Sequence, residues 1–246
     1  MSVEIVVAAI SGTIAMLSAV VAVWGQFRVN HLDHDLEKLK IKAEDERNSA
    51  RYREPLVRAA ADLQSRLFNI LDRNFVEEFM VNGTDREKEY AANNTAFLFA
   101  QFFAWTEAVR LEIQFISMDD DQKTKALSSL QSRIYSLLQS NEFPNVLRLF
   151  AGEQRAIGER MLSLGAKGLK CYGYSDFLLP NGVSSDTLIV YLHQDVASLK
   201  TRHKEAVPRL AALQNALVEL IDYLDPQFIR FPKNERSKWQ PKVEAT

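Results

Sequence analysis

The feature that most constrains this chain is a run of twenty residues without an ionisable side chain, residues 5–24, close to its first residue. The hydrocarbon core of a bilayer is about 30 Å thick, and ~20 apolar residues in a helix cross it at 1.5 Å each. The run therefore predicts a transmembrane helix, and we expect residues 1–28 to form a membrane anchor.

Two other interpretations of this run stay open. A cleaved signal peptide usually has a basic segment before a shorter apolar one, whereas no Lys or Arg precedes Ile5. A buried helix of a globular domain rarely stays uncharged over such a length. The Lys and Arg residues near the run all follow it: Arg28, Lys38, Lys40 and Lys42. This bias predicts a single-pass protein with its N-terminus outside and its C-terminal domain cytoplasmic.

Small residues recur along the run at alternating steps of three and four, which places them on one face of the helix: Ala8, Ser11, Ala15, Ser18 and Ala22. Such a face allows two membrane helices to approach closely. Larger apolar residues continue the same phase into residues 29–52: Val29, Leu32, Leu36 and Leu39. With charged residues around them, they predict a short parallel coiled-coil stalk. We expect self-association through both segments, as a homodimer or higher homo-oligomer; the alternative is a stalk that packs on its own domain.

The remainder of the chain predicts an all-α fold. Few glycines and prolines, nine and seven, and few alternating apolar runs argue against a β-rich fold. A helix break is predicted near Arg53 and Glu54, with Pro55 in the first turn of the next helix. Apolar residues then repeat at helical spacing, which predicts an antiparallel bundle of about six helices over residues 53–226. Residues 227–246 are predicted to form a loosely ordered tail with basic and aromatic residues.

Two helix starts carry recognisable caps. Thr84 and Glu87 have the spacing of a capping box, in which each side chain bonds the main-chain N–H of the other. Asp186 is placed to cap a later helix, which reaches toward Arg202, and a last helix follows Pro208. Between these regions, residues 165–185 have the glycines, prolines and aromatic residues of an ordered loop.

Composition excludes several kinds of chemistry. A net charge of -2 gives no electrostatic reason to bind nucleic acid. Cys171 is the only cysteine, so intramolecular disulfides and thiolate zinc clusters are excluded. The phosphate-binding loops GxxxxGK[ST] and GxGxxG, the zinc helix HExxH and the nucleophile elbow GxSxG are all absent from the sequence. We therefore predict no cofactor and favour a non-enzymatic role.

One polar cluster is the candidate site. The apolar stripe of the helix that follows Pro144 passes through Glu153, which places a carboxylate on the core face. A buried carboxylate requires a cation or several donors. We predict a buried cluster that either fixes the register of the helices or binds a ligand or substrate: Glu107, Arg110, Glu153 and Arg155. His31 and His34, three residues apart, are weak metal candidates because a coiled coil would turn them toward solvent.

These patterns predict a membrane-anchored protein whose helical domain is an interaction or signalling module for an unknown protein partner. Two alternatives follow from the same features. One is a membrane-perturbing effector whose spans oligomerise on activation. The other is an enzyme that acts on a membrane-proximal substrate through the Glu107 and Glu153 cluster.

Overall fold

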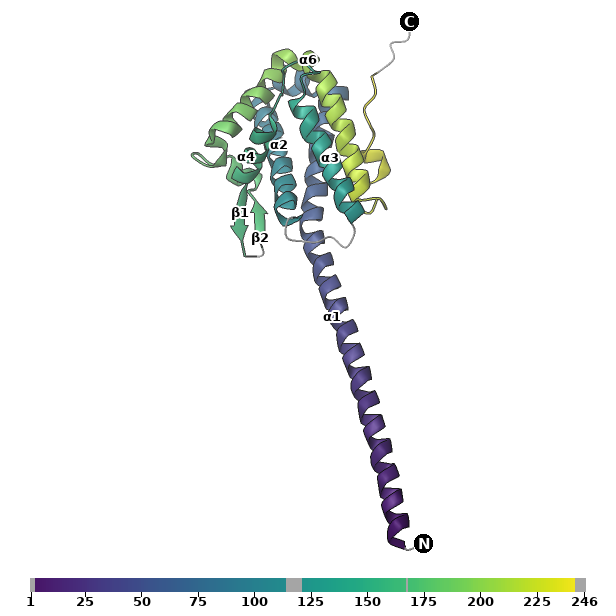
Figure 1. Cartoon of the computed structure of the whole chain (residues 1–246). Helices are drawn as coiled ribbons and strands as arrows, with labels where there is room; N and C mark the ends of the chain where they lie inside the picture. Colours follow the sequence, from purple (N-terminus) through teal and green to yellow (C-terminus); the bar gives the residue numbers. More distant parts are fainter. Residues whose placement is uncertain (1–2, 114–120, 167, 242–246) are drawn as a thin grey trace. The chain divides into compact units, whose positions relative to one another are not determined.

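A computed structural model describes residues 3–113, 121–166 and 168–241 (Figure 1). At some positions of the helices, most of them near the N-terminus, it describes the main chain without the side chain. The chain divides into two units, Met1–Ser49 and Ala50–Thr246.

The first helix, α1, runs without interruption over Val3–Asp72. The predicted break near Arg53 and Glu54 is therefore wrong, and Pro55 lies inside the helix. A proline there removes one main-chain donor and crowds the preceding turn, at a cost of about 3 kcal/mol. The neighbouring Tyr52 and Leu56 are buried in the core of the second unit. Burial of such side chains contributes about 1.5–3 kcal/mol each, which offsets the cost of the proline.

The predicted membrane anchor is a second correction. Across the described residues, no helix combines the length and the hydropathy that crossing a bilayer requires. By this finding the transmembrane helix, the single-pass topology and the membrane localisation are wrong, together with the three functions that depend on them. The prediction rested on the whole run of residues 5–24, many of whose side chains lie outside the described part of the structure to which this finding applies.

The second unit is built mainly of helices, which confirms the predicted all-α class. Its long elements are the end of α1 and four further helices: α2 (Asp85–Ile113), α3 (Asp121–Gln139), α4 (Ala151–Arg160) and α6 (Thr187–Leu224). α2 packs against α4 and α6, and α3 packs against α6 (Figure 1). Short helical turns complete the unit: η1 (Val76–Val81), α5 (Tyr174–Phe177), η2 (Val183–Ser185) and η3 (Lys233–Glu235).

A small hairpin lies where an ordered loop is predicted. β1 (Leu162–Gly165) pairs in antiparallel fashion with β2 (Gly168–Cys171), and Leu162 lies opposite Cys171. Gly168 has φ +108°, a conformation that residues with a side chain rarely adopt. The hairpin is an addition to the all-α class, and it follows directly on α4 (Figure 1).

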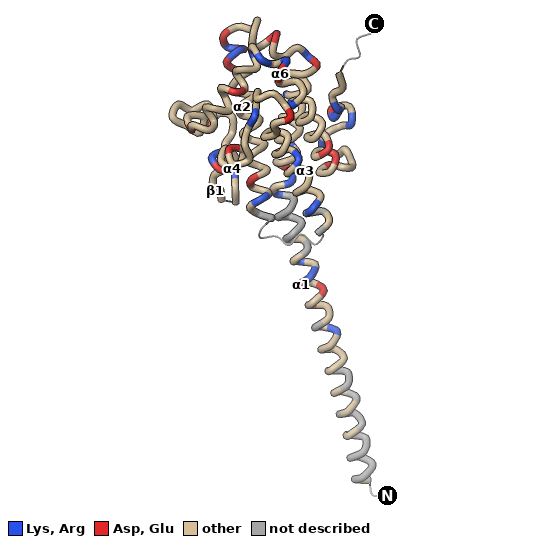
Figure 2. Tube along the Cα trace, turned by 45° about the horizontal axis from the view of Figure 1, so that its top comes forward, with Lys and Arg blue, Asp and Glu red and all other residues tan. Residues whose placement is uncertain are grey.

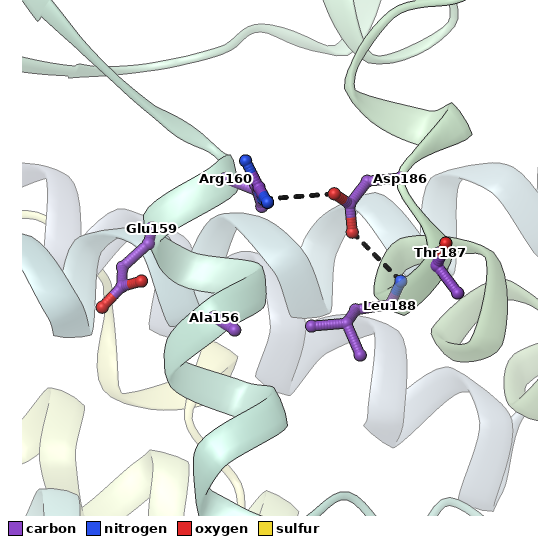
Figure 3. A pocket seen from close by; sticks show the side chains of 6 residues that line it. All are labelled: Ala156, Glu159, Arg160, Asp186, Thr187 and Leu188. Carbon is purple, nitrogen blue, oxygen red and sulfur yellow. Dashed lines mark hydrogen bonds and ion pairs between the residues drawn. The ribbon is translucent and has the colours of Figure 1, made fainter.

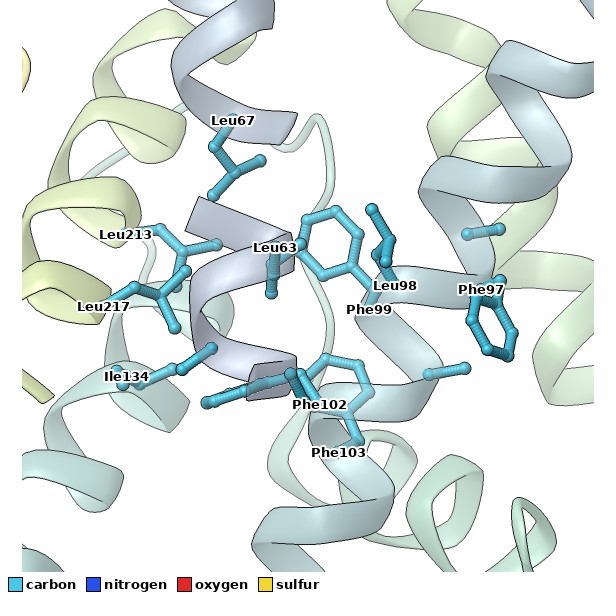
Figure 4. Packing of buried hydrophobic residues seen from close by; sticks show 14 of the residues in the cluster. Leu63, Leu67, Phe97, Leu98, Phe99, Phe102, Phe103, Ile134, Leu213 and Leu217 are labelled. Carbon is cyan, nitrogen blue, oxygen red and sulfur yellow. The ribbon is translucent and has the colours of Figure 1, made fainter. Parts of the chain in front are cut away.

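The core of the second unit lies between α1, α2, α3 and α6 (Figure 4). Large buried side chains of α1 and α2 lie there beside leucines of α6: Leu63, Leu67, Phe99, Phe102, Phe103, Leu213 and Leu217. A helix that is apolar on most of its faces, as α2 is between residues 96 and 104, is typical of the centre of a bundle.

Both predicted caps are confirmed. The Thr84 N–H donates to Glu87 Oε2 at 2.8 Å, and the Glu87 N–H donates back to Thr84 Oγ1 at 3.4 Å. Asp186 Oδ1 accepts the N–H of Leu188 at 3.0 Å at the start of α6. The two helices predicted on either side of Arg202 meet at a kink within α6, where the main chain of Arg202 is not helical and its φ is -121°.

The segment after α6 is held against the helical unit. Asp225 accepts main-chain N–H groups from Ile229, Arg230 and Phe231 at 3.1–3.2 Å, which turns the chain. Arg236 is 5% exposed and pairs with the Asp225 carboxylate. Residues 237 and 239 then bond Gln214 of α6, ten residues before the end of that helix, so the chain runs back along it (Figure 1).

Candidate functional site

The centre of the predicted cluster is a buried ion pair within α2. Glu107 is 0% exposed, and Arg110 reaches it with two hydrogen bonds, Nε to Oε2 at 2.8 Å and Nη2 to Oε1 at 2.5 Å. The hydrogen bonds with Glu107 raise the pKa of Arg110, although its partial burial opposes this. The Arg110 side chain remains 38% exposed. The carboxylate is thus held in the core by a cation that water also reaches.

Tyr135 of α3 is a member of this cluster that sequence reasoning missed. Its buried hydroxyl has no hydrogen-bond partner. Burial, followed by the negative charge of Glu107, raises the pKa of Tyr135 to about 12, while Arg155 and Arg110 oppose the shift. The structure therefore brings Glu107, Arg110 and Arg155 near one phenol. In the sequence, the only sign of this role is that Tyr135, with its polar hydroxyl group, lies between the apolar positions Ile134 and Leu138.

Glu153 is placed differently from the rest of the predicted cluster. Its Oε2 accepts the Phe150 N–H at 2.8 Å, so it caps the start of α4. The core position belongs to its neighbour Gln154, which is 0% exposed. Gln154 Nε2 donates to the main-chain oxygens of Leu149 at 2.8 Å and Tyr135 at 3.2 Å. Gln154 thus takes the role that the sequence suggested for Glu153, as the buried polar contact between α4 and α3.

α2 and α4 approach closely beside this cluster. A Cβ added at Gly158 would lie 2.6 Å from the main-chain oxygen of Phe103 and 3.1 Å from the Cβ of Glu107. Only a glycine allows the two helices this separation. The contacts of the cluster therefore tie α2, α3 and α4 together, which is the chemistry expected of groups that fix helix register.

A second buried cation lies at the C-terminal end of α3. Arg209 of α6 is 0% exposed, and its guanidinium donates five hydrogen bonds, all to main-chain oxygens. The acceptors belong to the end of α3 and the segment after it: Leu137, Leu138, Ser140, Pro144 and Val146. Burial, and then the charge of Arg148, lowers the pKa of Arg209. Sequence reasoning missed this residue because its acceptors carry no side-chain signature.

A third cation, Arg66 of α1, lies among aromatic rings. Its guanidinium is 4.2 Å from the ring centre of Phe75 and 5.9 Å from that of Tyr90. Arg66 Nη2 donates to Asn94 Oδ1 at 2.7 Å, and burial lowers the pKa of Arg66. Tyr174 meets Tyr90 edge to face at 6.3 Å. These contacts join α1, α2 and α5 with Phe75, the residue before η1, and sequence reasoning did not single them out.

An open cavity of about 500 Å³ lies between the end of α4 and the start of α6 (Figure 3). Arg160 Nε lies 3.1 Å from Asp186 Oδ2, and the other oxygen of Asp186 caps α6 through Leu188 (Figure 3). Both carboxylate oxygens are therefore engaged. These contacts explain how α6 begins, and they do not by themselves indicate a ligand.

The predicted self-association residues lie on α1. Val29, Leu32, Leu36 and Leu39 are 55%, 59%, 52% and 63% exposed. Ser11, Ser18 and Ala22 are exposed, while the side chains of Ala8 and Ala15 lie outside the described part of the structure. His31 and His34 are exposed on the same helix. Over the described residues, no three His, Cys, Asp or Glu side chains are placed to hold a metal ion.

Cys171, in β2, is 9% exposed. Burial raises the pKa of its thiol to about 12. A thiol reacts as its thiolate, so at neutral pH this group is far from the reactive form.

Comparison of the chain with protein-family models, with curated proteins and with solved structures gives no match.

Proposed function

We propose that this chain is a homodimerising helical protein, in which residues 29–39 of α1 pair in parallel with the same residues of a second copy. The observation that supports this most strongly is the exposure of four large apolar side chains at steps of three and four, Val29, Leu32, Leu36 and Leu39. Each contributes about 1.5–3 kcal/mol when it is fully buried. A second copy of the same helix supplies a surface of matching length and spacing.

The residues that flank this stripe support a parallel arrangement. With Val29 and Leu36 at position a, and Leu32 and Leu39 at position d, the flanking positions g and e hold charges of both signs along α1 (Figure 2). In a parallel pair, position g of one helix faces position e of the next heptad of the other. Arg28 then faces Asp33 of the second copy, and Asp35 faces Lys40. Both contacts are attractive.

The stripe also indicates how many helices pair and where pairing ends. A β-branched residue at a with leucine at d, as in Val29 and Leu32, favours two strands over three or four. The stripe of large apolar residues ends at Leu39, because the next position a holds Ala43, which can bury little surface. Pairing is therefore short, and we expect a dimer that dissociates on dilution. Its function would be to join two copies of the Ala50–Thr246 unit, so that each partner meets two identical surfaces.

Charge reversal tests this proposal in the full-length chain. Asp35→Lys places like charges opposite each other, and we expect the dimer dissociation constant to rise by about tenfold or more. Adding Lys40→Asp restores opposite charges, so the double variant should recover dimerisation. Sedimentation velocity over a range of concentrations measures both. Failure of the double variant to recover would contradict the parallel pairing, and a wild-type chain that stays monomeric would contradict the dimer.

A further inference from the structure

The chain after α6 is held to that helix through its main chain. Gln214 of α6 is 0% exposed. Its Nε2 donates to the main-chain oxygen of Ser237 at 2.9 Å, and its Oε1 accepts the main-chain N–H of Trp239 at 2.9 Å. One buried side-chain amide thus bonds residues 237 and 239, two positions apart in a segment that forms neither helix nor strand. Recognition of this kind is typical of sites that hold extended peptides.

The surrounding contacts add one charge and one further amide. Lys238 Nζ lies 2.7 Å from Glu219 Oε1, and Arg133 of α3 pairs with the other oxygen of Glu219. Asn215 Nδ2 donates weakly to the main-chain oxygen of Trp239 at 3.4 Å, while its buried Oδ1 has no partner. The segment is therefore recognised through its main chain and one lysine.

We propose that Gln214, Asn215 and Glu219 form a peptide-binding surface, and that residues 237–239 occupy it in place of a segment from a partner protein. The partner segment would be extended and would carry a lysine at the position of Lys238, opposite Glu219. Gln214 presents both its donor and its acceptor to this segment, so any extended main chain in the same position can satisfy both groups of the amide.

Residues 237–239 can exchange with a partner segment because the chain is anchored separately, at Arg236. Arg236 is buried with Asp225 and fixes the chain just before residue 237. Lys238 and Trp239 remain partly exposed beyond this anchor. A tethered segment of this kind competes at an effective concentration in the millimolar range, so a partner segment displaces it when it binds the surface more tightly than residues 237–239 do. Residues 237–239 can therefore leave the surface while Arg236 stays in place.

The test uses the full-length chain and a fluorescein-labelled peptide of residues 235–241. Trp239→Pro removes the N–H that Gln214 accepts, and it frees the surface in the chain itself. We expect this variant to bind the peptide at least about tenfold more tightly than the wild type does. Gln214→Ala in the same background should lose that gain, and so should a peptide N-methylated at Trp239. Glu219→Lys should select a peptide in which Glu replaces Lys238.

Three results would overturn the proposal. One is the absence of an anisotropy change for Trp239→Pro at up to about 1 mM peptide. Another is equal binding with and without Gln214→Ala, which would show that the peptide binds elsewhere. The third is loss of helical circular dichroism in Trp239→Pro, which would show that residues 237–239 are a structural part of the unit. A Lys238→Ala variant, which keeps every main-chain contact, is the matched control for folding.

Discussion

Arg209 Nε donates a hydrogen bond to the main-chain oxygen of Val146 at 3.1 Å, although the two residues lie 63 positions apart. The other four N–H groups of the same guanidinium go to four more main-chain oxygens at 2.6–3.1 Å. A guanidinium has five donors, so none remains unsatisfied. The carbonyl groups at the end of α3 have no partner within that helix, and a positive charge there interacts favourably with the helix dipole. Arg209 thus joins α6 to the end of α3.

Replacing Arg209 should therefore be severely destabilising. Arg209→Met keeps much of the side-chain length but leaves several buried carbonyl oxygens unsatisfied. We expect the free energy of unfolding to fall by about 3 kcal/mol or more. Urea denaturation followed by circular dichroism measures this loss. Arg209→Lys has three donors and no planar fork, so its free energy of unfolding should lie between those of wild type and Arg209→Met. Equal stability of Arg209→Met and wild type would contradict this role.

Replacing Arg110 and replacing Glu107, the two members of the ion pair in α2, should lower the stability of the protein by different amounts. Arg110→Met leaves the fully buried Glu107 carboxylate without a cation, and we expect a loss of about 3–5 kcal/mol. Glu107→Gln leaves a guanidinium that is 38% exposed and remains hydrated, so the loss should be only about 1–2 kcal/mol. Chemical denaturation of both variants gives the comparison. A larger loss for Glu107→Gln would show that the arginine, rather than the carboxylate, depends on the pair.

Two glycines of α4 should have opposite effects. Gly158→Ala forces a Cβ within 2.6 Å of a main-chain oxygen of α2, and we expect a loss of about 1–3 kcal/mol. Gly152, on the same helix, has nothing within 4 Å of such a Cβ. Gly152→Ala should therefore be neutral or about 0.5–1 kcal/mol more stable, because alanine favours the helix. Thermal unfolding of the pair tests this, and a similar loss for both would show that the effect does not come from the close approach of the helices.

Acid should release the segment that Asp225 holds. Burial alone would raise the pKa of Asp225, but bonds from the main chain of Arg230, Phe231 and Ile229 and the charge of Arg236 hold it below the usual range. A group whose pKa is lower in the folded state stabilises above its unfolded pKa, about 3.9, and loses that contribution as the pH falls below it. The difference in unfolding temperature between wild type and Asp225→Asn should therefore shrink between pH 6 and pH 3. A constant difference would contradict this.

The features that the sequence predicted correctly are local ones. The cap formed by Thr84 and Glu87 depends on residues three positions apart, and so does the contact of Glu107 with Arg110. Helical geometry brings such residues together wherever the helix lies in the fold. Asp186 caps α6 for the same reason.

The features that the sequence did not predict depend on tertiary contacts. Glu153 was expected in the core because the helix was predicted to begin near Pro144, whereas α4 begins at Ala151. One position along a helix is a rotation of about 100°, so Gln154 takes the core position. Pro55 failed to break α1 because the packing of its neighbours outweighs its local cost. The acceptors of Arg209 are main-chain atoms, which no sequence pattern marks.

Cross-linking at single positions of α1 tests the proposed dimer most directly. In a parallel pair, position 36 of one copy meets position 36 of the other, whereas Ile41, at 56% exposed, lies at position f on the outer face. Cys171, the one native cysteine, is buried. Under mild oxidation of the full-length chain we expect Leu36→Cys to form a disulfide-linked dimer and Ile41→Cys to remain largely monomeric. Equal cross-linking of the two variants, or none in Leu36→Cys, would contradict parallel pairing of α1.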